Sequence, residues 1–197
     1  MTHKILAFGY QSRVGKDSCC EAICRSGLVR EFQLSDYAKA AFADRLKSVS
    51  YDLFCAHGLR QAQFYERGEP GAKLRDVPLE TIGKTPVEIW IEVGQKMREV
   101  YPAVWVEAAL AWRRSSVLLV ITDLRFPNEA AAVKQLGGWC VNVKRPGNPV
   151  KGSDRFLDDD YPWDATIHNT GSLEDLEAQA IQMARGYLRA SAAEPCA

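Results

Sequence analysis

Short apolar runs and longer amphipathic segments alternate along the chain of 197 residues. The short runs, rich in β-branched and aromatic residues, predict strands, and the segments with apolar residues three or four positions apart predict helices. Strands are expected at Ile5–Phe8, Ala38–Phe42, Val117–Ile121, Trp139–Lys144 and Ala165–Ile167. Helices are expected at Gly15–Arg25, after Phe42 with Leu46, Val49, Leu53 and Phe54 on one face, at Thr85–Val100, at Val104–Trp112, from Pro127, and at Leu173–Leu188.

This alternation of strands and helices predicts an α/β fold with a parallel sheet covered on both faces. Two stretches interrupt the pattern, at 58–78 and 145–164, and both are rich in glycine, proline and charged residues. We expect both stretches to be loops.

The first predicted strand leads into a loop and then a helix, with the sequence ILAFGYQSRVGKDSCC. A loop bounded by Gly9 and Gly15 can wrap its backbone N–H groups around a phosphate, and the helix that follows adds its positive dipole end. Lys16 would reach the outer phosphates. We interpret the stretch as the phosphate-loop pattern G-x-x-x-x-G-K-[ST], with Asp17 in place of the hydroxyl residue that ligates magnesium. The alternative is a glycine-rich turn with a solvated Lys16.

Two polar residues, Asp123 and Arg125, follow the apolar run Val117–Ile121. An acidic residue at the end of a buried parallel strand suits a magnesium ion bound to phosphates, and an arginine beside it can stabilise charge on a transferring phosphoryl group. Asp123 could instead cap the helix that begins at Pro127. Asp17 also has two possible roles. It could hold magnesium, or it could be a carboxylate in the first helical turn that is stabilised by the helix dipole.

Further polar and basic residues follow the second predicted strand or lie in the loop 58–78. Asp44, Arg45 and Lys47 come where open α/β sheets bind ligands, although a solvated first helical turn is the alternative. Lys73 and Arg75 lie in a loop that resembles a lid, although a charged surface loop is the commoner case.

The helix predicted from Thr85 begins with a capping threonine and a proline in its first turn. Its expected apolar face is formed by Ile89, Val93 and Met97, and Arg98 near its end either binds a ligand or complements the helix dipole. In the next helix, we expect Trp105 to anchor the core.

Composition excludes several classes of function. The 25 basic residues balance the 25 acidic ones, so bulk charge does not favour nucleic acid or membrane surfaces as partners. We find no apolar run of about 20 residues and no signal peptide, and expect a cytoplasmic protein. The six cysteines show no C-x-x-C pair and no histidine at zinc-site spacing. They are expected to be small buried hydrophobes, apart from an exposed Cys196, and His168 to be a surface residue.

Five segments together resemble the deoxynucleoside monophosphate kinases of bacteriophages, a branch of the P-loop nucleoside monophosphate kinases. They are GYQSRVGKDS, AFADRLK, TPVEIWIEVGQKMREVYPAVWV, VITDLRFPNEA and DATIHNTGSLEDL. The resemblance implies a three-layer P-loop NTPase fold with a five-stranded parallel sheet in the order 2-3-1-4-5. It implies one domain over 1–190, with acceptor and lid regions inserted at about 58–112 and 145–164, and a flexible tail at 191–197.

The reaction implied by this resemblance is transfer of the γ-phosphoryl group of ATP to a deoxynucleoside 5′-monophosphate, with Mg²⁺, to supply precursors for DNA synthesis. The catalytic residues would be Lys16, Arg125 and Asp44. The ATP site would comprise Gly9, Ser12, Arg13, Val14, Gly15, Lys16, Asp17 and Ser18, and the metal ligands would be Asp17 and Asp123. The acceptor would meet Lys47, Arg98, Arg45, Lys73, Arg75 and Gln95, and the lid would contribute Arg145 and Arg155. The protein could act as a monomer or as a homodimer.

The chain departs from the family at Val87 and Ile91, where arginine and glutamine are common, and the accepted base is therefore open. Two other functions remain. One is a kinase that phosphorylates a modified base in phage DNA, against which the zero net charge argues. The other is an ATP-binding protein without turnover, which Lys16, Asp123 and Arg125 disfavour.

Overall fold

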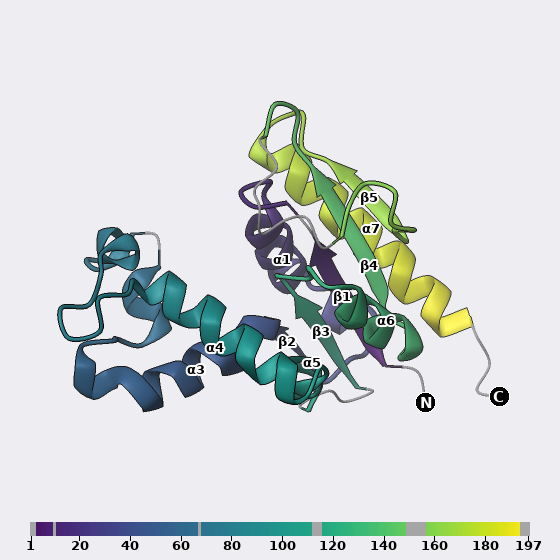
Figure 1. Cartoon of the computed structure of the whole chain (residues 1–197). Helices are drawn as coiled ribbons and strands as arrows, with labels where there is room; N and C mark the ends of the chain where they lie inside the picture. The colour runs from purple at the N-terminus through teal and green to yellow at the C-terminus, as the bar shows by residue number, and fades with distance from the viewer. Residues whose placement is uncertain (1–2, 10, 67, 112–115, 149–156, 194–197) are drawn as a thin grey trace. The chain divides into compact units, whose positions relative to one another are not determined.

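Figure 1 shows a computed structural model of the chain, which describes residues 3–9, 11–66, 68–111, 116–148 and 157–193. The chain forms two compact units. The first comprises Met1–Ala41 and Leu110–Ala197, and the second is Phe42–Ala109. The inserted region expected at about 58–112 falls mostly in the second unit, which begins earlier, at Phe42.

The first unit is built on a five-stranded sheet in which all neighbouring strands are parallel. Its order, β2-β3-β1-β4-β5, confirms the order 2-3-1-4-5. The strands are β1 (Lys4–Gly9), β2 (Asp36–Ala40), β3 (Val117–Ile121), β4 (Trp139–Lys144) and β5 (Ala165–His168). The helices are α1 (Lys16–Arg25), the short α2 (Leu28–Glu31), α6 (Pro127–Gln135) and α7 (Leu173–Ala193).

Alternate residues of the central strands face two different layers of helices. Leu6 and Phe8 of β1 share one buried cluster with residues of α1, α2 and α7. On the other face, the Cys140 thiol lies 3.7 Å from the Ala130 carbonyl oxygen of α6. The sheet is therefore covered on both faces, as the nearly continuous apolar strands predict.

Element boundaries differ from the expected ones at the second strand and at the end of the last helix. The second strand ends at Ala40, and Phe42 is the first residue of α3. This strand lies at the edge of the sheet and is half exposed, so its sequence lacks a continuous apolar run. Helix α7 extends past Leu188 to Ala193.

The second unit is helical, with α3 (Phe42–Phe54) and α4 (Pro86–Val100) lying side by side (Figure 1). The segment between them forms three short 3₁₀ helices, η1 (Cys55–His57), η2 (Ala62–Tyr65) and η3 (Ala72–Asp76). The last two of these lie in the stretch 58–78, where we expected a loop. A final helix, α5 (Val104–Leu110), follows α4. The side-chain hydroxyl of Thr85 accepts from the Glu88 N–H, which confirms the predicted cap of α4.

The buried face of α4 is rotated from the one expected. It comprises Pro86, Ile89, Trp90 and Gly94, while Met97 is exposed. The expectation for Trp105 is confirmed: it is buried, and its Nε1 donates to the Gly94 carbonyl oxygen at 3.1 Å. Gly94 and Trp90 are on the buried face because α3 and Trp105 approach α4 there.

The cysteines follow the expectation in part. Cys19, Cys20 and Cys140 are buried, and desolvation raises the pKa of Cys19 to about 12, so its thiol stays neutral. Cys55 was expected to be buried and is exposed, because it lies in η1 at the end of α3. Cys196 lies outside the described residues. No helix in the described residues is long and apolar enough to cross a membrane.

Candidate active site

The loop between β1 and α1 contains two residues with a left-handed backbone conformation. Gly15 adopts a φ of +104° immediately before α1, and Arg13 adopts a φ of +63°. A Cβ atom on Gly15 would lie 2.7 Å from Cδ2 of Leu176, which is closer than real Cβ contacts come. The left-handed backbone therefore favours glycine at position 15, and any larger residue would also displace the end of the Leu176 side chain.

The loop is one residue longer than the pattern G-x-x-x-x-G-K-[ST]. Five residues separate Gly9 from Gly15, and Gly9 itself is the last residue of β1, paired with Asn142 of β4. A Cβ atom on Gly9 would lie 2.6 Å from Cη2 of Trp163 and 2.9 Å from the Leu124 carbonyl oxygen. The structure therefore explains Gly9 by close packing at the sheet edge, whereas Gly15 and Lys16 open the helix.

Lys16 is the first residue of α1, and its ammonium group donates to the carbonyl oxygen of Gln11 in the same loop. Two asparagine side chains hold the loop from outside. Asn148 Nδ2 donates to the Ser12 carbonyl oxygen at 3.0 Å, and Asn169 Nδ2 donates to the Val14 carbonyl oxygen at 2.8 Å. These two asparagines were missed by the sequence analysis, because each lies more than 130 positions from its partner. The sequence offered one signal for a role at the loop, which is that both residues follow the ends of predicted strands.

Asp17 points away from the core, with 79% of its side chain exposed. Its Oδ1 atom lies 3.9 Å from Nζ of Lys39, which is also 4.0 Å from Oε1 of Glu21, one turn further along α1. Exposed ion pairs of this kind contribute about 0–1 kcal/mol, so Lys39 leaves the Asp17 carboxylate available to a stronger cation. Ser18, the following residue, is half-buried.

We predict that Asp17→Asn raises the magnesium concentration needed for half-maximal rate several-fold and lowers turnover, with little change in melting temperature. The reason is that a carboxylate beside a triphosphate is repelled unless a cation lies between them. Glu21→Gln is the matched control, because it removes a carboxylate near the same lysine but one turn further from the loop. A lower melting temperature with an unchanged magnesium requirement would assign Asp17 to the helix dipole instead.

The end of β3 brings Asp123 to the same edge of the sheet as the loop. Ala7 pairs with Ile121, and the Leu124 N–H donates to the Phe8 carbonyl oxygen at 3.1 Å. Asp123 therefore lies level with the end of β1, and it is half-buried. Arg125, also half-buried, follows it.

The turn that contains Arg125 is held by a buried carboxylate, which the sequence analysis did not single out. Glu129 is 2% exposed, and its Oε2 atom accepts from the N–H groups of Arg125 at 2.9 Å and Phe126 at 3.0 Å. A glutamate three residues after the N-cap is a known sequence signal for this arrangement. Glu129 thereby fixes the backbone between β3 and α6.

We predict that Glu129→Ala lowers the free energy of unfolding by about 2 kcal/mol, because two partly buried N–H groups lose their acceptor. Chemical denaturation measures this change. Glu129→Gln is the control, since its amide oxygen can still accept from one or both groups, and we expect it to lose less than half as much. Equal stability of Glu129→Ala and the unchanged protein would contradict a structural role for this carboxylate.

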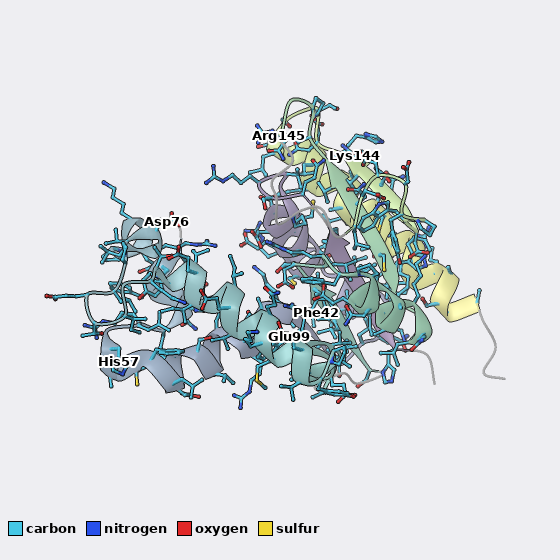
Figure 2. All side chains as sticks on the ribbon, viewed as in Figure 1. Phe42, His57, Asp76, Glu99, Lys144 and Arg145 are labelled. Carbon is cyan, nitrogen blue, oxygen red and sulfur yellow. The ribbon has the colours of Figure 1, made fainter. Side chains whose placement is uncertain are left out.

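A polar pocket of about 280 Å³ adjoins the loop in the first unit. It is lined by Gln11, Lys144, Arg145, Pro146, Asn148, Asp159 and His168. Lys144 and Arg145 lie together at the end of β4 (Figure 2), and Nζ of Lys144 forms an ion pair with Asp159 at 2.8 Å. His168, expected at the surface, is exposed and also lines this pocket. Of the two lid arginines, Arg145 thus borders the pocket, and Arg155 lies outside the described residues.

The residues expected to meet the acceptor all belong to the second unit, as does Asp44. Lys47 on α3 and Arg75 on η3 converge on the ring of Trp90, at 5.6 Å and 5.8 Å from its centroid. Arg98 is half-buried, and its Nη1 atom lies 3.4 Å from where a Cβ on Gly94 would be. The other four expected residues, Asp44, Arg45, Lys73 and Gln95, are exposed. The structure therefore gathers two of the seven around one aromatic ring.

Asp17 and Asp123 are the two carboxylates expected to hold magnesium. The described residues contain no group of three or more His, Cys, Asp or Glu side chains that could hold a metal ion. Magnesium at a nucleotide usually keeps several waters and takes only one or two carboxylates besides the phosphates. The exposed Asp17 and the half-buried Asp123 fit that donor set.

The sheet order, with all neighbouring strands parallel and helices on both faces, is consistent with a P-loop-like α/β fold. No family model matches the chain. The chain is 26% identical over 164 residues to a protein of Acanthamoeba polyphaga mimivirus named "Putative deoxynucleotide monophosphate kinase", covering 74% of this chain and 81% of that protein. The similarity supports a relation to nucleotide kinases. That relative comes from a giant virus, so the placement among bacteriophage enzymes stays a prediction.

Proposed function

We propose that the chain catalyses transfer of the γ-phosphoryl group of ATP to a deoxynucleoside 5′-monophosphate, giving ADP and the diphosphate. The observation that supports this most is the arrangement at one edge of a parallel sheet. There the loop ends at Gly15, Lys16 begins α1, and Asp123 lies two residues past the end of the neighbouring strand β3. Open α/β sheets bind ligands at this edge, and loops of this kind bind phosphates.

On this proposal, the donor phosphates lie on the loop, where Lys16 and the N-terminus of α1 offset their charge. The polar pocket that begins at Gln11 accommodates the nucleoside part of ATP, with Arg145 and His168 on its wall. Asp17 and Asp123 hold Mg²⁺, which neutralises charge on the phosphates when it is bound.

The transfer step forms one bond and breaks another. A phosphate oxygen of the acceptor forms a bond to the γ-phosphorus, and the bond from that phosphorus to the oxygen bridging the β-phosphate breaks, so the electron pair leaves with ADP. The acceptor phosphate has a second pKa of about 6 and is mostly dianionic at neutral pH, so no base is needed. The guanidinium of Arg125 offsets the charge spread over the transferring group.

One experiment tests this function against the two alternatives. The protein is incubated with γ-labelled ATP and magnesium and is offered each deoxynucleoside monophosphate, each ribonucleoside monophosphate and phage DNA in separate reactions. We expect label only in a deoxynucleoside diphosphate. Label in DNA without diphosphate would instead identify a kinase of DNA bases, and bound ATP without any transfer would identify a non-catalytic protein.

A further inference from the structure

One indole ring in the second unit lies against two positively charged side chains. Trp90 belongs to the buried face of α4 and is 7% exposed. Nζ of Lys47, from α3, lies 5.6 Å from the ring centroid, and the guanidinium carbon of Arg75, from η3, lies at 5.8 Å. Both distances are within the range of cation–π attraction, so three elements separated in the sequence converge on this ring.

The two cations have no countercharge in the part of the chain that the structure describes. No ion pair joins Lys47 or Arg75 to a carboxylate among those residues, whereas Lys84 and Lys96 of the same unit are paired with Glu92 and Glu99. Two like charges held on one ring repel each other, and the repulsion is relieved when an anion joins them. The arrangement is therefore suited to an anionic ligand.

The ring itself is held firmly by its neighbours. Tyr65 contacts it edge-on, with centroids 5.7 Å apart and planes at 78°, and its hydroxyl accepts from the Arg60 N–H at 2.9 Å. Leu59 and Ile89 complete the buried cluster. Such a ring presents a fixed surface to the side chains that lie against it.

An indole ring at this position has an energetic disadvantage compared with a phenyl ring. Its Nε1 atom is buried and has no hydrogen-bond partner among the described residues, which costs free energy that a phenyl ring would not lose. An indole face attracts cations more strongly than a phenyl or phenol face does. The advantage that offsets the buried N–H is therefore the attraction for Lys47 and Arg75.

We propose that Trp90 is a positioning residue, which holds Lys47 and Arg75 as a pair of cations for the 5′-phosphate of the acceptor nucleotide. This inference rests on the proposed function, and it adds Trp90 to the residues expected from the sequence. A dianionic phosphate supplies the countercharge that the two cations lack. We expect the base and sugar of the acceptor to make no contact with these two cations.

Isothermal titration calorimetry with the four deoxynucleoside monophosphates and the four matching deoxynucleosides tests the inference without turnover. For each monophosphate that the unchanged protein binds, we expect Trp90→Leu to weaken the affinity about 10-fold or more. The affinity for the matching deoxynucleoside, which lacks the phosphate, should be unchanged. Trp90→Phe keeps an aromatic face and should lose only about 3-fold. Tyr65→Leu is the matched control, because it removes an aromatic ring from the same cluster without removing the surface that the cations contact.

Several outcomes overturn the inference. They are an unchanged monophosphate affinity in Trp90→Leu, an equal loss for the deoxynucleoside, and an equal loss in Tyr65→Leu. If Trp90→Leu does not fold, Lys47→Gln and Arg75→Gln test the same pair of cations, and each must weaken binding of the monophosphate alone. An unchanged protein that binds no monophosphate contradicts the proposed function itself, which separates that failure from a failure of the role of Trp90.

Discussion

Lys16→Met should abolish phosphoryl transfer while leaving the fold intact. The lysine ammonium offsets charge that develops on the oxygens of the γ-phosphoryl group, and contributions of this kind are worth several kcal/mol, so turnover should fall by about 10³-fold or more. Stability should change little, because Lys16 is only half-buried and its ammonium donates to a loop carbonyl oxygen at the start of α1. Steady-state turnover and thermal unfolding measure the two effects.

Lys4→Met provides the matched control for this substitution. Lys4 is the first residue of β1 and lies at the amino edge of the sheet, the opposite end of the strand that leads into the loop. The same loss of charge there should leave turnover near normal. If Lys16→Met retains near-normal turnover, the loop before α1 is only a turn and the proposed ATP site is wrong.

The sequence predicted the sheet because its central strands are nearly continuous apolar runs. Residues 118–121 of β3 and 5–8 of β1 are buried, and this pattern does not depend on distant contacts. The position of Asp123 just after a strand followed from the same pattern. The edge strand β2 was misplaced by two residues because one of its neighbours is solvent, and its residues alternate only weakly.

The parts of the site that escaped prediction depend on contacts across long sequence separations. Lys39 approaches Asp17 only because β2 lies beside β3 in the sheet, with Lys39 paired to Val120. Asn148 and Asn169 reach the loop from segments that follow β4 and β5. A sequence pattern indicates that such residues lie at strand ends, but it does not indicate which carbonyl each will bind.

Trp90 was missed for a different reason, because the sequence pattern indicated the wrong buried face of α4. The apolar spacing of Ile89, Val93 and Met97 indicated a face of which only Ile89 is fully buried, whereas Met97 is exposed. The observed face includes Trp90 and Gly94, because Gly94 accepts from Trp105 and a Cβ there would lie 3.0 Å from Leu46. An apolar pattern gives a glycine no weight, although here the side chain of Leu46 from α3 packs closely against Gly94.

Asp123→Asn should lower turnover by about 100-fold or more and raise the magnesium requirement at least as much as Asp17→Asn does, because charge stabilisation at such sites is worth several kcal/mol. Asp123 lies level with the end of β1 and is half-buried, so its carboxylate is more shielded from water than that of Asp17. Electrostatic interactions are stronger where water is excluded, which is why we expect the larger effect here.

Magnesium titrations of the rate, with thermal unfolding measured in parallel, separate this role from a structural one. Asp36→Asn is the matched control, because Asp36 is the first residue of β2 and lies at the opposite edge of the sheet. It should leave both turnover and the magnesium requirement unchanged. If Asp123→Asn instead lowers the melting temperature while its magnesium requirement stays normal, Asp123 acts on the helix that begins at Pro127. Asp17 would then be the single carboxylate of the proposed metal site.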